Sequence, residues 1–281
     1  MKKILPIILP FLIVLILFII IILSVQESLF FYPWHDVESY NKLLENEKFK
    51  EVTIVNNGKV LKGWFVNNTK NEKAPLLIFF GGNANNTSNL CMRFEIKNIF
   101  NYFENYNVLM VDYPGYGLSE GRPSDVTMFE AALSTYDYAE KLENVDKQNI
   151  VVLGYSIGTG VATYLASQRD VNGLILIAPY DRALSLYNDN LNIFYGPIKI
   201  LTKYKFDSIS YAKDINVSPL IFTSYKDEVI NYKFSYNLAK YFKNEGETIV
   251  LDNTTHNGYF SESIVLEKIY NYLQERIKTQ D

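Results

Sequence analysis

A serine between two glycines is the feature of this sequence best suited to carry out chemistry. The pattern Gly-x-Ser-x-Gly at residues 154–158 directly follows the apolar run 150–153 and precedes a helical pattern that begins near Thr159. A nucleophilic serine on a strand–turn–helix elbow needs this arrangement, because glycines remove side chains that would clash and the helix N-terminus points free N–H groups at the reacting centre. Ser156 is therefore the predicted nucleophile. The alternative is a glycine-rich turn that only packs a helix against a strand.

A base must take the proton of a serine hydroxyl before that oxygen becomes a good nucleophile. The chain has two histidines. His35 precedes the first predicted strand, whereas His256 follows the last one. Where a serine on such an elbow is catalytic, the chain order is serine, acid, histidine. His256 is therefore the predicted base.

The acid in that order should follow a strand that lies between the serine and the histidine. Asp227 comes shortly after the apolar run 220–223. Its carboxylate would hold His256 in the required tautomer and stabilise the imidazolium. Glu228 is adjacent and Asp252 is more distant, and both are alternatives. All three acids could instead be solvated turn residues.

An oxyanion hole needs backbone N–H donors directed at the tetrahedral oxygen. The residue after the nucleophile, Ile157, should supply one donor, and the loop 80–85 should supply the other. This loop begins with two glycines after its first residue, which allows close approach of the backbone to a substrate. We predict Asn83 as the second donor, with Ala84 as the next choice, and we predict that Ala84 and Tyr155 contact the substrate. An ordinary glycine turn that leads into a helix cap is the alternative.

Apolar runs separated by helical patterns indicate the elements that position these residues. Asn57-Gly58 is a strong hairpin signal between the first two strands. Later runs are continuously apolar, which is typical of strands covered on both faces. Strands alternating with helices predict an α/β fold with a mostly parallel sheet flanked by helices. The predicted strands are residues 50–55, 60–66, 75–80, 107–111, 149–153, 173–177, 220–223 and 248–251.

Three apolar stripes predict helices between and after these strands. The first stripe consists of Met92, Ile96, Ile99 and Phe103. The second follows Ser124, a predicted N-cap, and consists of Phe129, Leu133 and Tyr136. The third, near the C-terminus, consists of Leu266, Ile269, Leu273 and Ile277.

Residues 181–218 interrupt the alternation of strands and helices. The segment is long, aromatic and contains Gly196-Pro197. A loop of this length inside a compact domain usually has its own structure or serves as a lid. We predict a short cap over the site, with a surface excursion that carries a short helix as the alternative.

Residues 4–23 are almost entirely apolar. A helix of 20 residues is about 30 Å long, which matches the hydrocarbon core of a bilayer. We predict a membrane anchor at residues 1–26, a linker at 27–49 and the hydrolase-like domain at 50–281. A cleaved signal peptide is the alternative, but its apolar part is usually shorter and small residues precede its cleavage site.

The charges that flank the anchor predict its orientation. Lys2 and Lys3 precede the apolar stretch, whereas Glu27 and Asp36 follow it. By the positive-inside rule the N-terminus is cytoplasmic. We therefore expect a single-pass protein whose domain lies on the non-cytoplasmic side.

Composition narrows the remaining functional classes. The net charge is −4 and no run of Lys and Arg forms a nucleic-acid-binding face. No cluster of cysteine and histidine has zinc-binding spacing. The predicted serine mechanism needs neither a metal nor an organic cofactor, so we expect none. The single cysteine, Cys91, rules out an intramolecular disulfide, and its place on an apolar stripe indicates a small buried side chain.

Several motifs resemble those of the Bem46-like, or ABHD13-like, membrane-associated α/β hydrolases, and the resemblance covers nearly the whole chain. Residues 78–86, Ile-Phe-Phe-Gly-Gly-Asn-Ala-Asn-Asn, are similar to the family's apolar strand followed by His-Gly-Asn-Ala-Gly-Asn. Residues 112–121, Asp-Tyr-Pro-Gly-Tyr-Gly-Leu-Ser-Glu-Gly, resemble its Asp-Tyr-Arg-Gly-Tyr-Gly-x-Ser-x-Gly. Asp227 and the pair His256-Asn257 match its acid and its His-Asn pair. The resemblance implies the α/β-hydrolase fold and hydrolase activity, without a defined substrate.

The chain departs from that family's pattern at three positions. Gly81 replaces a histidine, Asn85 replaces a glycine and Pro114 replaces an arginine. The first departure concerns the shape of the oxyanion loop, although backbone donors do not need the histidine side chain.

Taken together, these residues predict a membrane-anchored serine hydrolase that acts on a small-molecule ester, thioester or similar acyl substrate. A peptidase or amidase would use the same residues. A catalytically silent, membrane-tethered binding protein is the alternative from another functional class, because one fold hosts many functions.

Overall fold

The computed structural model describes residues 5–277 of the chain. Within that range eight strands form one sheet in the order β1-β2-β4-β3-β5-β6-β7-β8. The strands are β1 (Phe49–Asn56), β2 (Lys59–Val66), β3 (Ala74–Phe80), β4 (Asn107–Val111), β5 (Val145–Tyr155), β6 (Gly173–Ile177), β7 (Leu220–Ser224) and β8 (Glu247–Leu251). Each of the eight predicted strands is confirmed.

The sheet is mostly parallel, as predicted. β1 and β2 form an antiparallel hairpin, and β2 pairs antiparallel with β4. Every other pair is parallel. Asn57 and Gly58 turn the hairpin with φ of 48° and 74°, which asparagine and glycine adopt more readily than other residues. The central strand β3 is buried along its whole length, which explains its continuous apolar sequence.

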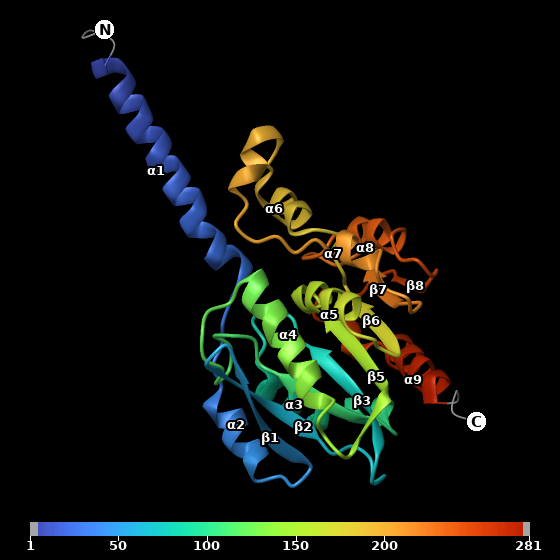
Figure 1. Ribbon diagram of the computed structural model, residues 1–281. Coiled ribbons are helices and arrows are strands. Elements are labelled where there is room, and N and C mark those ends of the chain that lie inside the picture. The colour runs from blue at the N-terminus through green and yellow to red at the C-terminus, as the bar shows by residue number, and fades with distance from the viewer. Residues whose placement is uncertain (1–4, 278–281) are drawn as a thin grey trace.

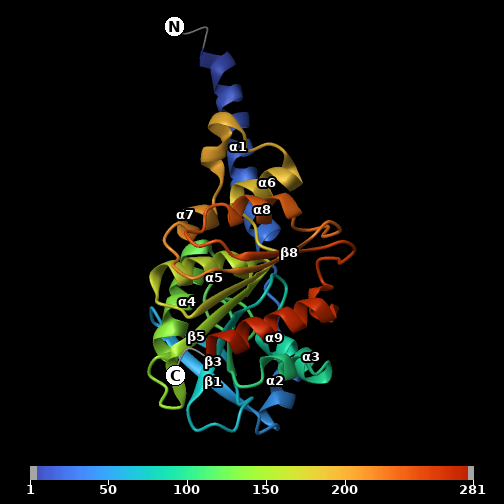
Figure 2. The ribbon, with the colours of Figure 1, turned by 90° about the vertical axis from the view of Figure 1, so that its right-hand side faces the viewer.

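Helices cover both faces of the sheet. Figures 1 and 2 show α4 and α5 on one face and α3 and α9 on the other. The α-helices are α1 (Leu5–Phe30), α2 (Val37–Leu44), α3 (Thr87–Ile96), α4 (Asp125–Ala139), α5 (Ile157–Gln168), α6 (Ala183–Leu191), α7 (Ser208–Ala212), α8 (Tyr232–Ala239) and α9 (Ser263–Ile277). Short 3₁₀ helices are η1 (Ile99–Phe103), η2 (Gly196–Leu201) and η3 (Tyr259–Ser261).

The predicted cap and stripe of α4 are confirmed. Ser124 and Thr127 form a reciprocal capping box at its N-terminus. Phe129 and Tyr136 are buried, and Leu133 packs against the same core. The C-terminal stripe is confirmed in the same way on α9, whose residues Leu266, Ile269 and Leu273 are buried and whose Ile277 is partly buried.

The stripe from Met92 to Phe103 is not one helix. α3 ends at Ile96, and Asn98 follows in the left-handed conformation with φ of 55°. This residue ends the helical path, so Ile99 and Phe103 reach the core from the separate turn η1. Ile96 itself is 73% exposed and does not contribute to the buried face.

The predicted cap lies between β6 and β7 and consists of α6, η2 and α7.

The segment predicted as a linker, residues 27–49, contains the end of α1 and all of α2. Phe30 and Phe31 are buried against the cap, with ring centroids 4.6 Å from Tyr187 and 4.7 Å from Tyr204, respectively. The end of α1 is therefore packed into the domain.

Among residues 5–277, one helix is long and apolar enough to cross a membrane by length and composition. This stretch is Leu9–Ser28, within α1. Figure 1 shows α1 extending away from the sheet. Lys2 and Lys3, on which the predicted orientation depends, lie outside the described residues.

Candidate active site

The turn between β5 and α5 holds Ser156 in an unusual backbone conformation. Its φ is 54° and its ψ is −122°, a combination that costs a non-glycine residue on the order of 1–3 kcal/mol. The flanking glycines are required by close contacts. A Cβ on Gly154 would lie 2.5 Å from the carbonyl oxygen of Gly158, and a Cβ on Gly158 would lie 2.3 Å from that of Phe80. The elbow therefore packs α5 tightly against β5 and the end of β3.

The structure brings together the three side chains predicted as nucleophile, base and acid. His256 Nε2 lies 2.9 Å from Ser156 Oγ. His256 Nδ1 lies 3.0 and 2.9 Å from the two carboxylate oxygens of Asp227. Because an ionised carboxylate only accepts hydrogen bonds, the fitting tautomer has Nδ1–H donating to Asp227 and Nε2 accepting from the serine hydroxyl. This is the geometry in which the imidazole can take the serine proton.

Asp227 is held in an ionised state by its surroundings. Burial acts to raise its pKa, but the hydrogen bond and charge of His256, together with the backbone N–H groups of Ile230 and Val229, outweigh burial and lower the pKa. The N–H groups of Val229 and Ile230 also donate to Asp227 Oδ1, at 3.0 and 2.8 Å. The hydroxyl of Tyr259 donates to Oδ2 at 3.0 Å.

Tyr155 and Glu228 support His256 from two other sides. The Tyr155 hydroxyl donates to the carbonyl oxygen of His256 at 2.7 Å, and the two rings stack with centroids 5.3 Å apart. Glu228 accepts from the backbone N–H of His256 at 3.1 Å. Asp227, rather than Glu228, thus faces the imidazole, and Glu228 faces the backbone of the same residue.

The two predicted oxyanion donors lie on the same cavity as the serine. Ile157 is the first residue of α5, so its N–H has no partner within the helix. Asn83 follows β3, and both residues line the cavity with Ser156.

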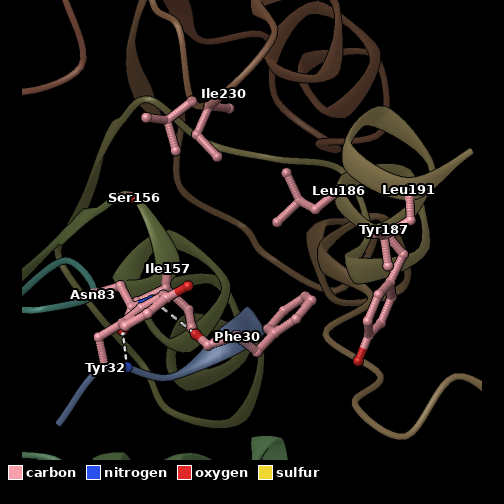
Figure 3. A pocket seen from close by; sticks show the side chains of 10 residues that line it. Phe30, Tyr32, Asn83, Ser156, Ile157, Leu186, Tyr187, Leu191 and Ile230 are labelled. Atoms are coloured by element: carbon pink, nitrogen blue, oxygen red, sulfur yellow. Dashed lines mark hydrogen bonds between the residues drawn. The ribbon is translucent and has the colours of Figure 1, made fainter. Parts of the chain in front are cut away.

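The Asn83 side chain joins the oxyanion loop to the end of α1. Its Nδ2 donates to the carbonyl oxygen of Phe30 at 2.8 Å. Its Oδ1 accepts from the N–H of Tyr32 at 2.9 Å and from the hydroxyl of Tyr116 at 2.7 Å. Figure 3 shows the two bonds to the α1 end. Nothing in the sequence pattern pointed to this link.

The two glycines of this loop differ in what they tolerate. A Cβ on Gly81 would have its nearest neighbour 3.8 Å away, whereas a Cβ on Gly82 would lie 2.9 Å from the ring of Tyr155. Position 81 therefore has room for a side chain, and the glycine that stands there in place of a histidine does not determine the shape of the loop. Position 82 does require glycine.

A mainly apolar cavity of about 240 Å³ opens beside the serine (Figure 3). Its walls come from the end of α1, the oxyanion loop, the elbow, the cap helix α6 and the turn after β7. The lining residues are Phe30, Tyr32, Asn83, Ser156, Ile157, Leu186, Tyr187, Leu191, Val229 and Ile230.

Neither residue predicted to contact substrate lines this cavity. Ala84 is exposed and has φ of 54°, and Tyr155 packs behind His256. The sequence indicated one source of the lining, because α6 belongs to the predicted cap, but it did not indicate Phe30 and Tyr32. Tyr259 was missed, because a tyrosine three residues after the histidine carries no distinctive signal.

Within the described part of the chain, the metal-ligating side chains and the thiol of Cys91 form no second reactive site. Among residues 5–277, no group of three or more His, Cys, Asp or Glu side chains is placed to hold a metal ion. Cys91 is fully buried, and burial raises the pKa of its thiol well above the ordinary value. It is a packing residue, as predicted.

Comparisons with known proteins agree with this fold. A family model described as the α/β hydrolase fold matches residues 75–211. An uncharacterized protein of Mycobacterium tuberculosis is 25% identical over 226 residues, which cover 80% of this chain and 78% of that protein. The α/β hydrolase domain-containing protein WAV2 of Arabidopsis thaliana is 33% identical over 118 residues, 41% of this chain and 37% of its own. An esterase from Pyrococcus furiosus superposes with a TM-score of 0.67 at 15% identity, covering 89% of this chain and 97% of the esterase.

Proposed function

We propose that this chain, which has the α/β-hydrolase fold, is a serine hydrolase that cleaves carboxylic esters, thioesters or related acyl compounds. The observation that carries the proposal is the continuous hydrogen-bonded path from Ser156 through His256 to Asp227. The solved esterase with the same fold supports the choice of acyl chemistry.

The proposed reaction has two halves. As Ser156 Oγ attacks the acyl carbonyl carbon, its proton moves to His256 Nε2, and Asp227 stabilises the resulting imidazolium. The negative charge on the former carbonyl oxygen is stabilised by the N–H groups of Ile157 and Asn83. The tetrahedral intermediate then breaks its bond to the alcohol or thiol, which leaves with the proton from Nε2, and an acyl-enzyme remains. Water, deprotonated by His256, releases the acid and restores the serine.

A fluorophosphonate probe tests the nucleophile directly. We expect it to label the folded full-length chain at Ser156 and to leave the Ser156→Ala variant unlabelled. Ser261→Ala is a matched control, since this serine is exposed and lies outside the cavity. Hydrolysis of p-nitrophenyl acetate should fall to background in Ser156→Ala only. Absence of labelling in the wild-type chain, or unchanged hydrolysis by Ser156→Ala, would falsify the proposal. Parallel assays with p-nitrophenyl esters and peptide anilides separate ester from amide preference.

We further propose that α1 is an uncleaved membrane anchor and that the chain falls among the Bem46-like, or ABHD13-like, enzymes. Two contacts support retention of α1. Gln26, within the apolar stretch, donates to the carbonyl oxygen of Leu201 and accepts from the N–H of Lys203 in the cap. Phe30 forms part of the cavity wall. Cleavage after Gln26 would remove its bonds to the cap, and cleavage after Phe30 would also remove this part of the cavity wall. The domain is then placed on the non-cytoplasmic side by the charges at Lys2 and Lys3.

A further inference from the structure

The cap is fixed to α1 within the stretch proposed to cross the membrane. Gln26 is fully buried and bonded to both sides of the junction after η2, at Leu201 and Lys203. Ile22, one turn earlier, is buried as well. At 1.5 Å per residue these side chains lie about 6 and 12 Å before Phe30 along the helix axis. The cap therefore reaches the depth of the last two turns of the apolar stretch Leu9–Ser28.

The part of the cap at that depth is apolar and exposed. We call residues 193–201 the cap tip. Figures 1 and 2 show this segment, which follows α6, rising alongside α1 and away from the sheet. Its large apolar side chains are exposed by 41% at Ile193, 58% at Tyr195, 42% at Ile198 and 82% at Ile200. Apolar side chains grouped at one exposed point indicate a surface that another phase or partner covers.

A lipid bilayer around α1 is one medium that could cover this surface continuously with the helix. The exposed side chains of α1 beside the tip are themselves apolar along most of the stretch Leu9–Ser28. If α1 crosses a bilayer, the tip has to lie in the same layer as the last turns of the span. Tyr195 and the exposed Lys199 suit that position, because tyrosine rings and long basic side chains favour the level of the lipid headgroups.

The cavity beside the serine is bordered by the end of α1 and by α6, the helix that directly precedes the cap tip. Phe30 of α1 and Leu186, Tyr187 and Leu191 of α6 form its wall on the cap side, and Ser156 lies at its other end. Phe30 and Tyr187 are in contact, with centroids 4.6 Å apart. The cavity wall therefore includes the last residue of α1 and the cap helix α6, which leads directly into the tip.

From this arrangement we propose that the cap tip inserts into the interfacial layer of the membrane and that the cavity receives its substrate from that layer, as an ester of a long acyl chain. The inference rests on the proposed hydrolase function and names the class of substrate for that same site. The acyl chain of such an ester would lie between α1 and α6, with its carbonyl carbon at Ser156.

The position of the tip is tested without reference to catalysis. An environment-sensitive NBD fluorophore is attached to Ile200→Cys in the full-length chain, reconstituted in phosphatidylcholine vesicles. The natural Cys91 is fully buried and does not compete for the label. We expect blue-shifted emission and quenching by a nitroxide on the lipid acyl chain. The matched control is Ile96→Cys, at an isoleucine 73% exposed on α3, far from α1 in Figure 1. Equal emission and absence of quenching at both sites would overturn the proposal.

The route of the substrate is tested with two substrates and one double variant. Ile198→Glu with Ile200→Glu should reduce hydrolysis of a long-chain acylglycerol in vesicles at least tenfold. Hydrolysis of soluble p-nitrophenyl acetate should change less than twofold, because neither residue lines the cavity. Ile96→Glu should change neither rate. Equal vesicle activity of the double variant and the wild type would refute the membrane route and leave the hydrolase proposal intact. A wild-type chain inactive on both substrates would instead refute the hydrolase function.

Discussion

The hydrogen bonds around Asp227 lead to a specific prediction about catalysis. Its carboxylate accepts hydrogen bonds from His256, from Tyr259 and from the N–H groups of Val229 and Ile230. In Asp227→Asn the amide N–H₂ would face Nδ1 and favour the tautomer with Nε2–H, which cannot accept the serine proton. We expect kcat for p-nitrophenyl acetate to fall by about 10³–10⁴, the size known for such a change in a serine protease, with little change in KM.

The neighbouring acid provides the control for this prediction. Glu228 accepts from the backbone N–H of His256 and makes no bond to its ring. Glu228→Gln keeps an acceptor oxygen there, so kcat should fall less than tenfold. A larger loss in Glu228→Gln than in Asp227→Asn would reverse the assignment of the acid.

A second buried acid predicts a dependence of stability on pH. Burial raises the pKa of Asp112 to about 6, although the N–H of Thr87, which donates at 2.7 Å, acts to lower it. The folded chain thus holds this proton more tightly than the unfolded chain, in which the pKa of aspartate is about 3.9. The contribution of Asp112 to the free energy of unfolding is therefore fully present below about pH 4 and is lost as the pH rises through about 6.

Asp112→Asn removes that titration. A difference of about two in pKa corresponds to about 3 kcal/mol, so the variant should gain on the order of that amount relative to the wild type between pH 4 and pH 7. Urea unfolding in detergent micelles at pH 4, 5.5 and 7 measures the difference. Two parallel stability curves would show that Asp112 does not titrate in this range.

The sequence was sufficient to predict the site residues whose order along the chain is characteristic, namely the serine, the acid and the histidine. Ser156, Asp227 and His256 each follow a strand, and parallel strands end at the same edge of a sheet, so position along the chain implied proximity. The hydrogen-bond partners of Tyr259 and of the Asn83 side chain could not be predicted from the sequence. These bonds depend on how a turn and a distant helix end are placed in space, and hydrophobic periodicity carries no information about that placement.

At the scale of elements, the junction of α5 with β3 and β5 sets where the nucleophile stands. Gly158→Ala would place a Cβ 2.3 Å from the carbonyl oxygen of Phe80 and 2.6 Å from that of Gly81. Helix and strand must then separate. We expect a loss of about 1–3 kcal/mol in the free energy of unfolding, the usual cost of overpacking, and a fall in kcat of about tenfold or more, because Ser156 moves with the helix.

Gly81→Ala is the matched control, because its added Cβ meets nothing closer than 3.8 Å and its φ is not positive. Its free energy of unfolding should differ from that of the wild type by less than about 1 kcal/mol, the range in which replacing glycine reduces the freedom of the unfolded chain. Chemical unfolding of both variants measures the contrast. Equal losses in the two would show that the contact with Phe80 does not limit the substitution.

Elements were predictable where the pattern was long and the neighbours were regular. The hairpin, the buried strands, α4 and α9 all have a single dominant period. The stripe beginning at Met92 failed because one left-handed residue, Asn98, divides it. The inner structure of the cap was not predictable either, since η2 takes its place from contacts with α1, more than 170 residues away.

At the scale of the whole molecule, the N-terminal helix proposed as an anchor also contributes to the cavity beside Ser156. The last residue of α1, Phe30, and Tyr32 just after the helix both line the cavity, and Asn83 bonds to both through their backbone atoms. The predicted division into anchor, linker and domain therefore describes the order of the sequence but not the boundaries of function. The apolar stretch Leu9–Ser28 and the cavity-lining residue Phe30 are parts of the same helix, α1.

Two truncations separate the anchoring role of α1 from its role in the site. Removal of residues 1–20 keeps Ile22, Gln26 and Phe30 with their contacts, so kcat for p-nitrophenyl acetate should change less than twofold. Removal of residues 1–32 takes away the bonds of Asn83 to Phe30 and Tyr32, and the backbone donor predicted at Asn83 loses its support. A misplacement of about 1 Å at a catalytic group can cost about 10²-fold in rate, so kcat should fall at least tenfold.

Circular dichroism of both proteins establishes that the sheet is intact, and fluorophosphonate labelling should remain in both, because Ser156 and His256 are untouched. Equal kcat values for the two truncated proteins would show that the end of α1 anchors the chain without positioning the oxyanion loop.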